Sequence, residues 1–335
     1  MAEYYHYGQP SEEWVKLNAP SNSAALAGLS PIELQAAVNK DRETAAKQKI
    51  QSDTSLLGVE TVDELIPTRD NSKIPARVYR PRDRAPDERL PVLVFFHGGG
   101  FIFGTIEGES YTCLRIVSKQ RAVLIHICYR HTPTHQYPTQ INDAWDGFEW
   151  AVSHAERLGG DNTKLILGGI SAGAALAASV VLRENQSRPG NSRIAGQLLG
   201  IPWLLHPNVW TSRMETEQCS YAQNKDGPIL TLGLARLFAT QLNVADINEE
   251  IQFVGNAKDN DLKGMPRTVM LVAGMDLLRD EALEFEKRLK SQGVETKCHV
   301  FSGLPHGFYR HLELSATDEW FKSITDGIAW ISSRE

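Results

Sequence analysis

Long apolar runs are missing from this sequence, and cysteine is scarce. No stretch approaches the roughly 18–20 apolar residues that a membrane-spanning helix needs, so we expect no membrane segment. The four cysteines, Cys113, Cys128, Cys219 and Cys298, have no metal-ligand spacing. Cys128 lies in an apolar run and is expected to be an inert core thiol. The cysteines therefore predict no metal site.

Basic residues are not in excess either. The 335 residues include 35 Lys and Arg against 41 Asp and Glu, a formal net charge of −6. Nucleic acids and anionic membranes normally require a basic face, so we expect neither as a partner. The N-terminal stretch MAEYYHYGQPSEEW has no basic segment followed by an apolar run, which indicates no secretory signal and a cytoplasmic location.

Nucleotide-binding glycine loops are also missing. The pattern G-x-x-x-x-G-K-[ST] does not occur, and a G-x-G-x-x-G beginning at Gly98 would need glycine where Phe103 stands. The glycine run after His97 must therefore serve another purpose, and a dinucleotide cofactor is not predicted.

Short apolar strands alternate with amphipathic helices through most of the chain. The pattern predicts strands at 77–80, 91–96, 122–129, 164–168, 198–205, 268–273 and 296–301, and helices at 31–51, 141–157, 171–183, 232–241, 281–292 and 318–332. Continuous apolar strands such as 91–96 (PVLVFF) are typical of strands buried on both faces. Their alternation with helices predicts an α/β fold with a mostly parallel sheet and helices on both faces.

The stretch between 205 and 268 interrupts this alternation, because it shows no clear strand. We interpret it as an insertion that joins the N-terminal helices in a helical cap over the carboxyl edge of the sheet. The predicted division is N-terminal cap helices over 1–55, a first part of the core over 56–205, a cap insertion over 206–265, and a second part of the core over 266–335.

A G-x-S-x-G pattern, Gly169–Gly173, lies where the strand at 164–168 turns into a helix. Such a sharp turn needs small flanking residues and holds the serine hydroxyl out at the end of the sheet, beside the helix amides. Ser171 is therefore the predicted nucleophile. The alternative is a tight glycine turn whose serine has no chemical role.

The segment His97–Gly98–Gly99–Gly100 directly follows the strand at 91–96. Acyl transfer develops an oxyanion that needs amide donors aimed at its position. Glycine has no Cβ, so its amide can approach a substrate closely. We expect the amides of Gly98, Gly99 and Ala172 to form an oxyanion hole, and His97 to fix this loop rather than act as a base.

Asp276 comes just past the strand at 268–273 and is the predicted acid. Asp280 and Glu281 are the nearby alternatives, but they fall at the start of a helix, where carboxylates commonly offset the helix dipole.

His306 is the predicted base, because it occupies a glycine-containing loop after the last strand. Of the other histidines that follow the acid, His299 lies inside a strand and His311 begins a helical stretch. The order Ser, Asp, His is the one that the α/β-hydrolase topology requires. In the expected mechanism His306 takes the proton of Ser171, which attacks an acyl carbonyl, and water then hydrolyses the acyl-enzyme.

Five blocks of sequence, taken together over about 75–332, resemble the hormone-sensitive-lipase family of α/β-hydrolases, in its bacterial and fungal esterase branch. They are His97–Phe101 (HGGGF), Tyr129–Arg130 with Pro133, Tyr137–Pro138 and Asp143, Gly169–Gly173 (GISAG), Asp276–Glu281 (DLLRDE), and His306–Phe308 (HGF). The resemblance implies the α/β-hydrolase fold with a mostly parallel eight-stranded sheet, a two-part cap, esters of small or medium acyl groups as substrates, and no cofactor.

Two residues depart from the family pattern and leave the substrate preference open. Ile170 stands where the family often has an acid before the nucleophile, and Leu277 where it usually has proline or a small residue. Arg130 and Asp143 are interpreted as a loop-fixing pair without a chemical role.

The substrate is expected to be a small-to-medium or bulky hydrophobic ester, such as a specialised metabolite. Candidate pocket residues follow the oxyanion loop, end a strand or lie in the cap: Phe101, Phe103, Trp203, Leu204, His206, Trp210 and Phe238. Each is as compatible with core packing as with substrate contact. An amide, formamide, lactone or thioester hydrolase with the same triad remains an alternative, as does a homodimer. A non-catalytic receptor of this fold is a weaker alternative, because such receptors lack the triad histidine.

Overall fold

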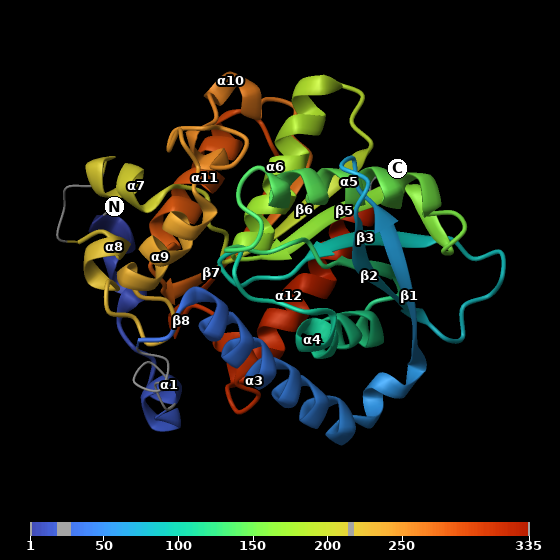
Figure 1. Cartoon of the computed structure of the whole chain (residues 1–335), viewed down its shortest axis with the longest axis horizontal. Coiled ribbons are helices and arrows are strands. Elements are labelled where there is room, and N and C mark those ends of the chain that lie inside the picture. The colour runs from blue at the N-terminus through green and yellow to red at the C-terminus, as the bar shows by residue number, and fades with distance from the viewer. Residues whose placement is uncertain (1, 19–27, 214–217, 334–335) are drawn as a thin grey trace.

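The centre of the molecule is one twisted sheet (Figure 1). The computed structural model describes residues 2–18, 28–213 and 218–333. Within them eight strands follow the order β1-β2-β4-β3-β5-β6-β7-β8. The strands are β1 Val59–Pro67, β2 Lys73–Pro81, β3 Leu90–Phe96, β4 Val123–Ile127, β5 Gly160–Ile170, β6 Ile194–Gly200, β7 Arg267–Met275 and β8 Thr296–Pro305. Only the β1–β2 and β2–β4 pairs are antiparallel, which confirms the mostly parallel eight-stranded sheet.

Helices cover both faces of this sheet. Figure 1 shows α5 and α6 on one side and α4 and α12 on the other. The helices of the core are α4 Ile106–Lys119, α5 Thr139–His154, α6 Ala172–Ser187, α11 Arg279–Ser291 and α12 Ser315–Ser332, with the 3-10 turn η4 Phe308–Arg310. The two-sided arrangement confirms the predicted α/β class.

The strand β3 shows how one apolar run contributes to two cores. Val92, Val94 and Phe96 pack in the core on the α5–α6 side, whereas Leu93 and Phe95 pack in the core on the α4–α12 side. Alternate side chains of a strand point to opposite faces, so a strand buried on both faces must be apolar throughout.

The remaining helices lie before β1 and between β6 and β7. They are η1 Ala2–Gly8, α1 Glu12–Leu17, α3 Pro31–Ser52 and η2 Thr54–Gly58 before the sheet, and α7 Pro207–Arg213, α8 Ser220–Gln223, α9 Leu232–Leu242, η3 Val254–Asn256 and α10 Asp259–Leu262 between β6 and β7. Two of them, η2 and α10, lead into the amino ends of β1 and β7. Figure 1 shows α8 beside the N-terminal turn η1. In the described parts of 206–265 there is no strand.

The sequence-based expectation does not include two elements, β1 and α4, because neither has a clear apolar pattern. The edge strand β1 pairs with β2 alone, and Val62 and Leu65 on it are exposed, so its pattern of burial is weak. The helix α4 buries Glu109, Ser110 and Thr112 among its apolar residues.

The strand predicted over 198–205 is shorter at its carboxyl end. It stops at Gly200, and the next residue, Ile201, takes a positive φ of 41°. The Ile201 amide still donates to the Leu271 carbonyl oxygen of β7, and after it the chain leaves the sheet. Residues 202–205 run next to the turn that contains Ser171, where the amide of Trp203 donates to the Ser171 carbonyl oxygen at 3.4 Å.

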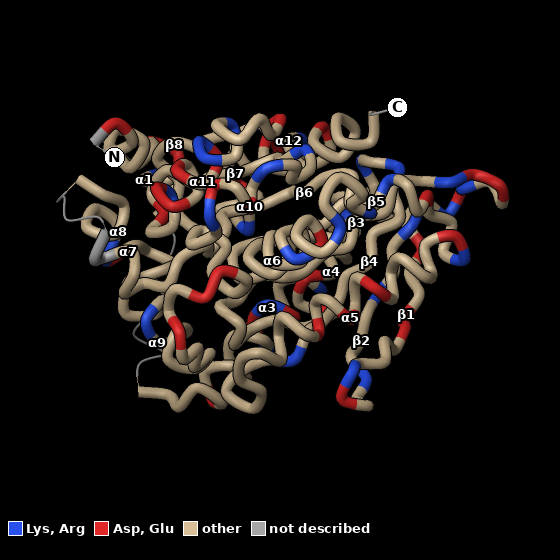
Figure 2. Tube along the Cα trace, turned by 90° about the horizontal axis from the view of Figure 1, so that it is seen from above, with Lys and Arg blue, Asp and Glu red and all other residues tan. Residues whose placement is uncertain are grey.

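Charged residues are distributed outside the central strands. Figure 2 shows Lys and Arg intermixed with Asp and Glu along the outer loops and helices. Strands β3 and β6 contain none of these residues, as expected for strands buried between two layers of helices.

Candidate active site

Ser171 occupies the turn between β5 and α6 with φ 56° and ψ −119°. The turn depends on its glycines: a Cβ on Gly169 would lie 2.4 Å from the Gly173 carbonyl oxygen, and one on Gly173 would lie 2.1 Å from that of Phe96. The Ser171 amide also donates to the Gly200 carbonyl oxygen at 2.8 Å. The local sequence therefore holds one serine in a conformation that side chains usually avoid.

His306 joins Ser171 to Asp276. Its Nε2 atom lies 3.0 Å from the Ser171 hydroxyl oxygen, and its Nδ1 atom lies 2.7 Å from Oδ2 of Asp276. His306 follows β8 and Asp276 follows β7, so the parallel neighbours β7 and β8 deliver both side chains to the same edge of the sheet. The arrangement can transfer a proton from the serine hydroxyl to an oriented imidazole.

Asp276 is buried, and its second carboxylate oxygen accepts the Leu278 amide at 3.0 Å. The alternative acids contact the chain that follows β6 instead. Asp280 accepts the Ser220 amide at 2.8 Å, and Glu281 accepts the Leu204 amide at 2.6 Å. Their helix position and their partners both separate them from the serine.

The alternative histidines also have other surroundings. His299 lies within β8, and His311 packs edge-on against the Trp14 ring at 5.4 Å between centroids. Burial lowers the pKa of His311. Of the three histidines that follow Asp276, the structure brings His306 to Ser171.

The loop that follows β3, with Gly98 and Gly99, lies directly against the turn that contains Ser171. A Cβ on Gly98 would lie 2.7 Å from the Ile170 carbonyl oxygen and 3.3 Å from the Ser171 Cβ. Gly99 has a φ of 138°, and its carbonyl oxygen accepts the amides of Ile102 and Phe103. Within the described residues the amides of Gly98 and Gly99 donate no hydrogen bond. They remain available as donors beside Ala172, the first residue of α6.

His97 is buried behind this loop. Its Nδ1 lies 3.1 Å from the Gly98 carbonyl oxygen, its ring stacks on Tyr129 at 4.5 Å between centroids, and the Tyr129 hydroxyl donates to the His97 carbonyl oxygen. Burial lowers the pKa of His97 to about 3, so the ring is neutral. These contacts support an architectural role for His97.

The candidate pocket residues fall into two groups. Phe101 contacts Trp203 at 5.6 Å between ring centroids, Phe103 contacts Phe238 at 5.6 Å, and the Phe238 ring covers Gly100. The structure therefore gathers these four aromatic residues around the oxyanion loop.

The other three candidates lie in different surroundings. Trp210 is fully buried against Tyr221, Leu204 is fully buried beside Glu281, and His206 is partly buried against the Phe253 ring. Their contacts are those of packing residues under the cap.

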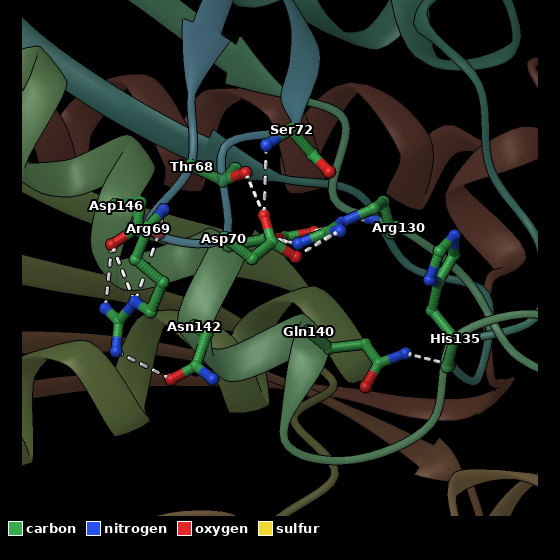
Figure 3. A network of polar contacts seen from close by, with 10 residues as sticks. Thr68, Arg69, Asp70, Ser72, Arg130, His135, Gln140, Asn142 and Asp146 are labelled. Atoms are coloured by element: carbon green, nitrogen blue, oxygen red, sulfur yellow. Dashed lines mark hydrogen bonds and ion pairs between the residues drawn. The ribbon is translucent and has the colours of Figure 1, made fainter.

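Arg130 and Asp143 fix the loop after β4. Asp143 is fully buried, and its carboxylate accepts hydrogen bonds from Nε and Nη2 of Arg130 at 2.9 and 2.6 Å. The third guanidinium nitrogen, Nη1, donates to the Asp70 carboxylate at 2.7 Å. Figure 3 shows Asp70 bridging from Arg130 to Thr68 and Ser72, with Arg69 and Asp146 paired beside them. This network ties the β1–β2 hairpin to α5.

The described residues contain no group of three or more His, Cys, Asp or Glu side chains arranged to hold a metal ion. None of the helices there has the length and apolarity to cross a membrane.

The chain is similar to a family of hydrolases. A family model described as the alpha/beta hydrolase fold matches residues 93–310. Esterase LipI of Mycobacterium tuberculosis is 30% identical over 239 residues, which are 70% of this chain and 71% of LipI. The versiconal hemiacetal acetate esterase of Dothistroma septosporum is 27% identical over 329 residues, 98% of this chain and 96% of its own length. A solved esterase of Pyrobaculum calidifontis matches with a TM-score of 0.77 and 27% identity, covering 94% of this chain and 99% of that one.

Proposed function

We propose that Ser171, His306 and Asp276 are the catalytic triad of this chain. The chain belongs to the α/β-hydrolase fold family and is a carboxylesterase-type hydrolase. The observation that carries the proposal is the hydrogen-bonded line from the serine hydroxyl through His306 to Asp276, at 3.0 and 2.7 Å.

The roles follow from the chemistry of each group. His306 takes the proton of Ser171 as the hydroxyl oxygen attacks the ester carbonyl, and Asp276 holds the imidazole tautomer and stabilises its positive form. The amides of Gly98, Gly99 and Ala172 receive the oxyanion. His306 then protonates the leaving alcohol and activates the water that hydrolyses the acyl-enzyme.

The substrate is an apolar ester, such as a specialised metabolite. Its acyl group is small to medium in length, and its alcohol part can be bulky. The aromatic group of Phe101, Phe103, Trp203 and Phe238 around the oxyanion loop supports an apolar substrate. The relative named for hydrolysis of a hemiacetal acetate matches 98% of the chain, which supports a small acyl group.

A paired assay tests the triad. Ser171→Ala is expected to lower kcat for a short p-nitrophenyl ester by about 10³-fold or more and to abolish labelling by a fluorophosphonate, because the acyl-accepting oxygen is gone. Circular dichroism and Tm verify that the variant is folded. Labelling that persists in Ser171→Ala would locate the nucleophile at another residue.

A panel of p-nitrophenyl esters from C2 to C12, together with acetates of bulky alcohols, tests the substrate class. We expect kcat/KM to be highest for the short acyl chains and to be retained for bulky acetates. A steady increase toward C12, with no hydrolysis of the bulky acetates, would contradict the proposed substrate.

A further inference from the structure

The helix α3 docks on the oxyanion loop through polar side chains. Gln35 donates to the Ile102 and Thr132 carbonyl oxygens at 2.6 and 3.1 Å, and Asn39 accepts the Gly104 amide at 2.8 Å. Arg42 donates from Nη1 to the Gly98 carbonyl oxygen at 3.2 Å. Positions 35, 39 and 42 recur at helical spacing, so one face of α3 follows the loop.

Apolar contact accounts for only part of this docking. Leu34 is buried, but Ile32 is 61% exposed. The polar face therefore has a specific task at the loop, because apolar packing alone would not need three side chains matched to four backbone partners.

Arg42 contacts the peptide unit that carries one proposed oxyanion donor. The Gly98 carbonyl and the Gly99 amide belong to the same planar trans peptide, so they point in opposite directions. A donor fixed on the carbonyl oxygen therefore fixes the direction of the Gly99 N–H. Polarisation of the carbonyl by a cation also makes that N–H a stronger donor.

The charge of Arg42 has no ion-pair partner among the described residues. Its guanidinium lies 5.5 Å from the centroid of the Phe103 ring, and the neighbouring carboxylate of Glu109 is bonded to Arg310 at 3.0 Å. Burial and the nearby Arg310 lower the pKa of Arg42 to about 10, which leaves the group charged at neutral pH. The Gly98 carbonyl oxygen is thus its one hydrogen-bond acceptor in the described part of the chain.

We propose that Arg42 is a positioning residue of the oxyanion hole, which orients and polarises the Gly98–Gly99 peptide from outside the substrate pocket. The inference rests on the proposed function, because it requires the Gly99 amide to bind the oxyanion. It predicts that Arg42 acts on the transition state and leaves binding of the ground-state ester nearly unchanged.

Lys49 provides a matched control on the same helix. Its Nζ donates to the Arg310 carbonyl oxygen at 2.5 Å and lies 5.6 Å from the centroid of the Tyr111 ring. Like Arg42 it is a cation that binds a backbone carbonyl beside an aromatic ring, but its peptide carries no proposed oxyanion donor. Lys49→Met reports what is lost when α3 merely docks less tightly.

The test compares Arg42→Met, Arg42→Lys and Lys49→Met with the natural chain, using a short ester and a boronic acid transition-state analogue. Loss of one oxyanion donor costs about 10²–10³ in turnover, so weakening one is expected to lower kcat of Arg42→Met by about 10–100-fold with KM changed less than about 3-fold. The inhibition constant of the boronic acid should rise by the same factor as kcat falls. Arg42→Lys should recover part of the loss, and Lys49→Met should keep kcat within about 3-fold.

Two results would overturn the positioning role, and one further variant tests the proposed function separately. Equal kcat in Arg42→Met and Lys49→Met, at equal loss of Tm, would overturn the positioning role. A rise in KM that matches the rise in the boronic acid constant would also overturn it, because Arg42 would then affect ground state and transition state alike. Ser171→Ala in the same assay tests the proposed function separately, since its inactivity is expected whether or not Arg42 acts on the loop.

Discussion

Ser171 combines the proposed reactive oxygen with a backbone conformation that costs free energy. Its φ of 56° with ψ −119° belongs to a region that glycine adopts far more easily than serine. Strain of this kind costs about 1–3 kcal/mol and persists only where the surrounding structure enforces it. The hydrogen bond from the Ser171 amide to Gly200 and the close approach of Gly173 to Phe96 enforce it here.

Replacing the strained residue should therefore stabilise the fold. Ser171→Gly is expected to raise the free energy of unfolding by about 1 kcal/mol relative to Ser171→Ala, because relief of strain exceeds the entropy that glycine adds to the unfolded chain. Both variants lack the hydroxyl, so the comparison isolates the backbone. Urea unfolding measures the difference, and a glycine variant less stable than the alanine variant would show that the turn is not strained.

The candidate site could be read from the sequence where a residue directly follows a strand. Ser171, Asp276 and His306 all do, and parallel strands bring such positions to one edge of the sheet. Their catalytic roles remain a prediction. Arg42 could not be found in this way, because its partner is a backbone carbonyl fifty-six positions away along the chain, and a hydrogen bond to a carbonyl leaves no pattern of residue types.

Glu281 connects the helix α11 to the segment that runs from the end of β6 to α8. Its carboxylate accepts the amides of Leu204 and Leu205 and the hydroxyl of Tyr221, all in buried surroundings. Burial raises the pKa of Glu281 well above the ordinary value. The residue is thus a buried anchor between α11 and the chain that follows β6.

Removing this anchor should loosen the chain that follows β6. Glu281→Ala leaves buried amides without an acceptor and is expected to lower the free energy of unfolding by about 2–4 kcal/mol, because each unsatisfied group costs about 1–3 kcal/mol. Glu281→Gln keeps an amide-accepting oxygen without the charge and serves as the control, with a loss below about 1 kcal/mol. Thermal and urea unfolding compare the variants; equal losses in both would contradict the acceptor role.

Elements with clear apolar patterns were predictable, and elements that bury polar groups were not. The strands β3, β5 and β7 and the helices α5 and α6 lie within a few residues of the predicted ranges. The strand β1 escaped because it is an edge strand with exposed apolar residues, and α4 because it buries Glu109, Ser110 and Thr112. Tertiary burial of polar side chains is decided by partners that are distant in sequence.

At the scale of the whole molecule, buried histidines make stability depend on pH. Burial lowers the pKa of His97 to about 3 and that of His126 to about 4, and it lowers that of His131 as well, from an ordinary value of 6.5. Below pH 6.5 the unfolded chain takes up protons that the folded chain does not. The free energy of unfolding must therefore fall as pH falls from 6.5 toward 4, by up to about 1.4 kcal/mol per pH unit for each histidine.

His126 offers the clearest test, because neither ring nitrogen has a hydrogen-bond partner in the described structure. His126→Leu is expected to reduce the loss of stability between pH 6.5 and 4.5 by about 1–2 kcal/mol, since one proton-binding group disappears from the unfolded chain. Urea unfolding of His126→Leu and of the natural chain at several pH values measures the difference. An unchanged slope in His126→Leu would contradict the assignment.

The fold class and the family were predictable at this scale because several sequence blocks had to agree. The predicted mostly parallel sheet is confirmed by the strand order, and the predicted hormone-sensitive-lipase family, in its esterase branch, by the match over residues 93–310 and by the esterase relatives. Location, oligomeric state and the extent of the cap remain predictions.

The order of the strands also has a consequence during protein synthesis. The nucleophile turn after β5 and the acid after β7 are made before the histidine after β8, which stands at position 306 of 335. Chains emerge from the ribosome N-terminus first. The proposed triad therefore stays incomplete in a nascent chain until the residues after β8 have been made, because a chain that already contains Ser171 and Asp276 still lacks the imidazole that would accept the serine proton.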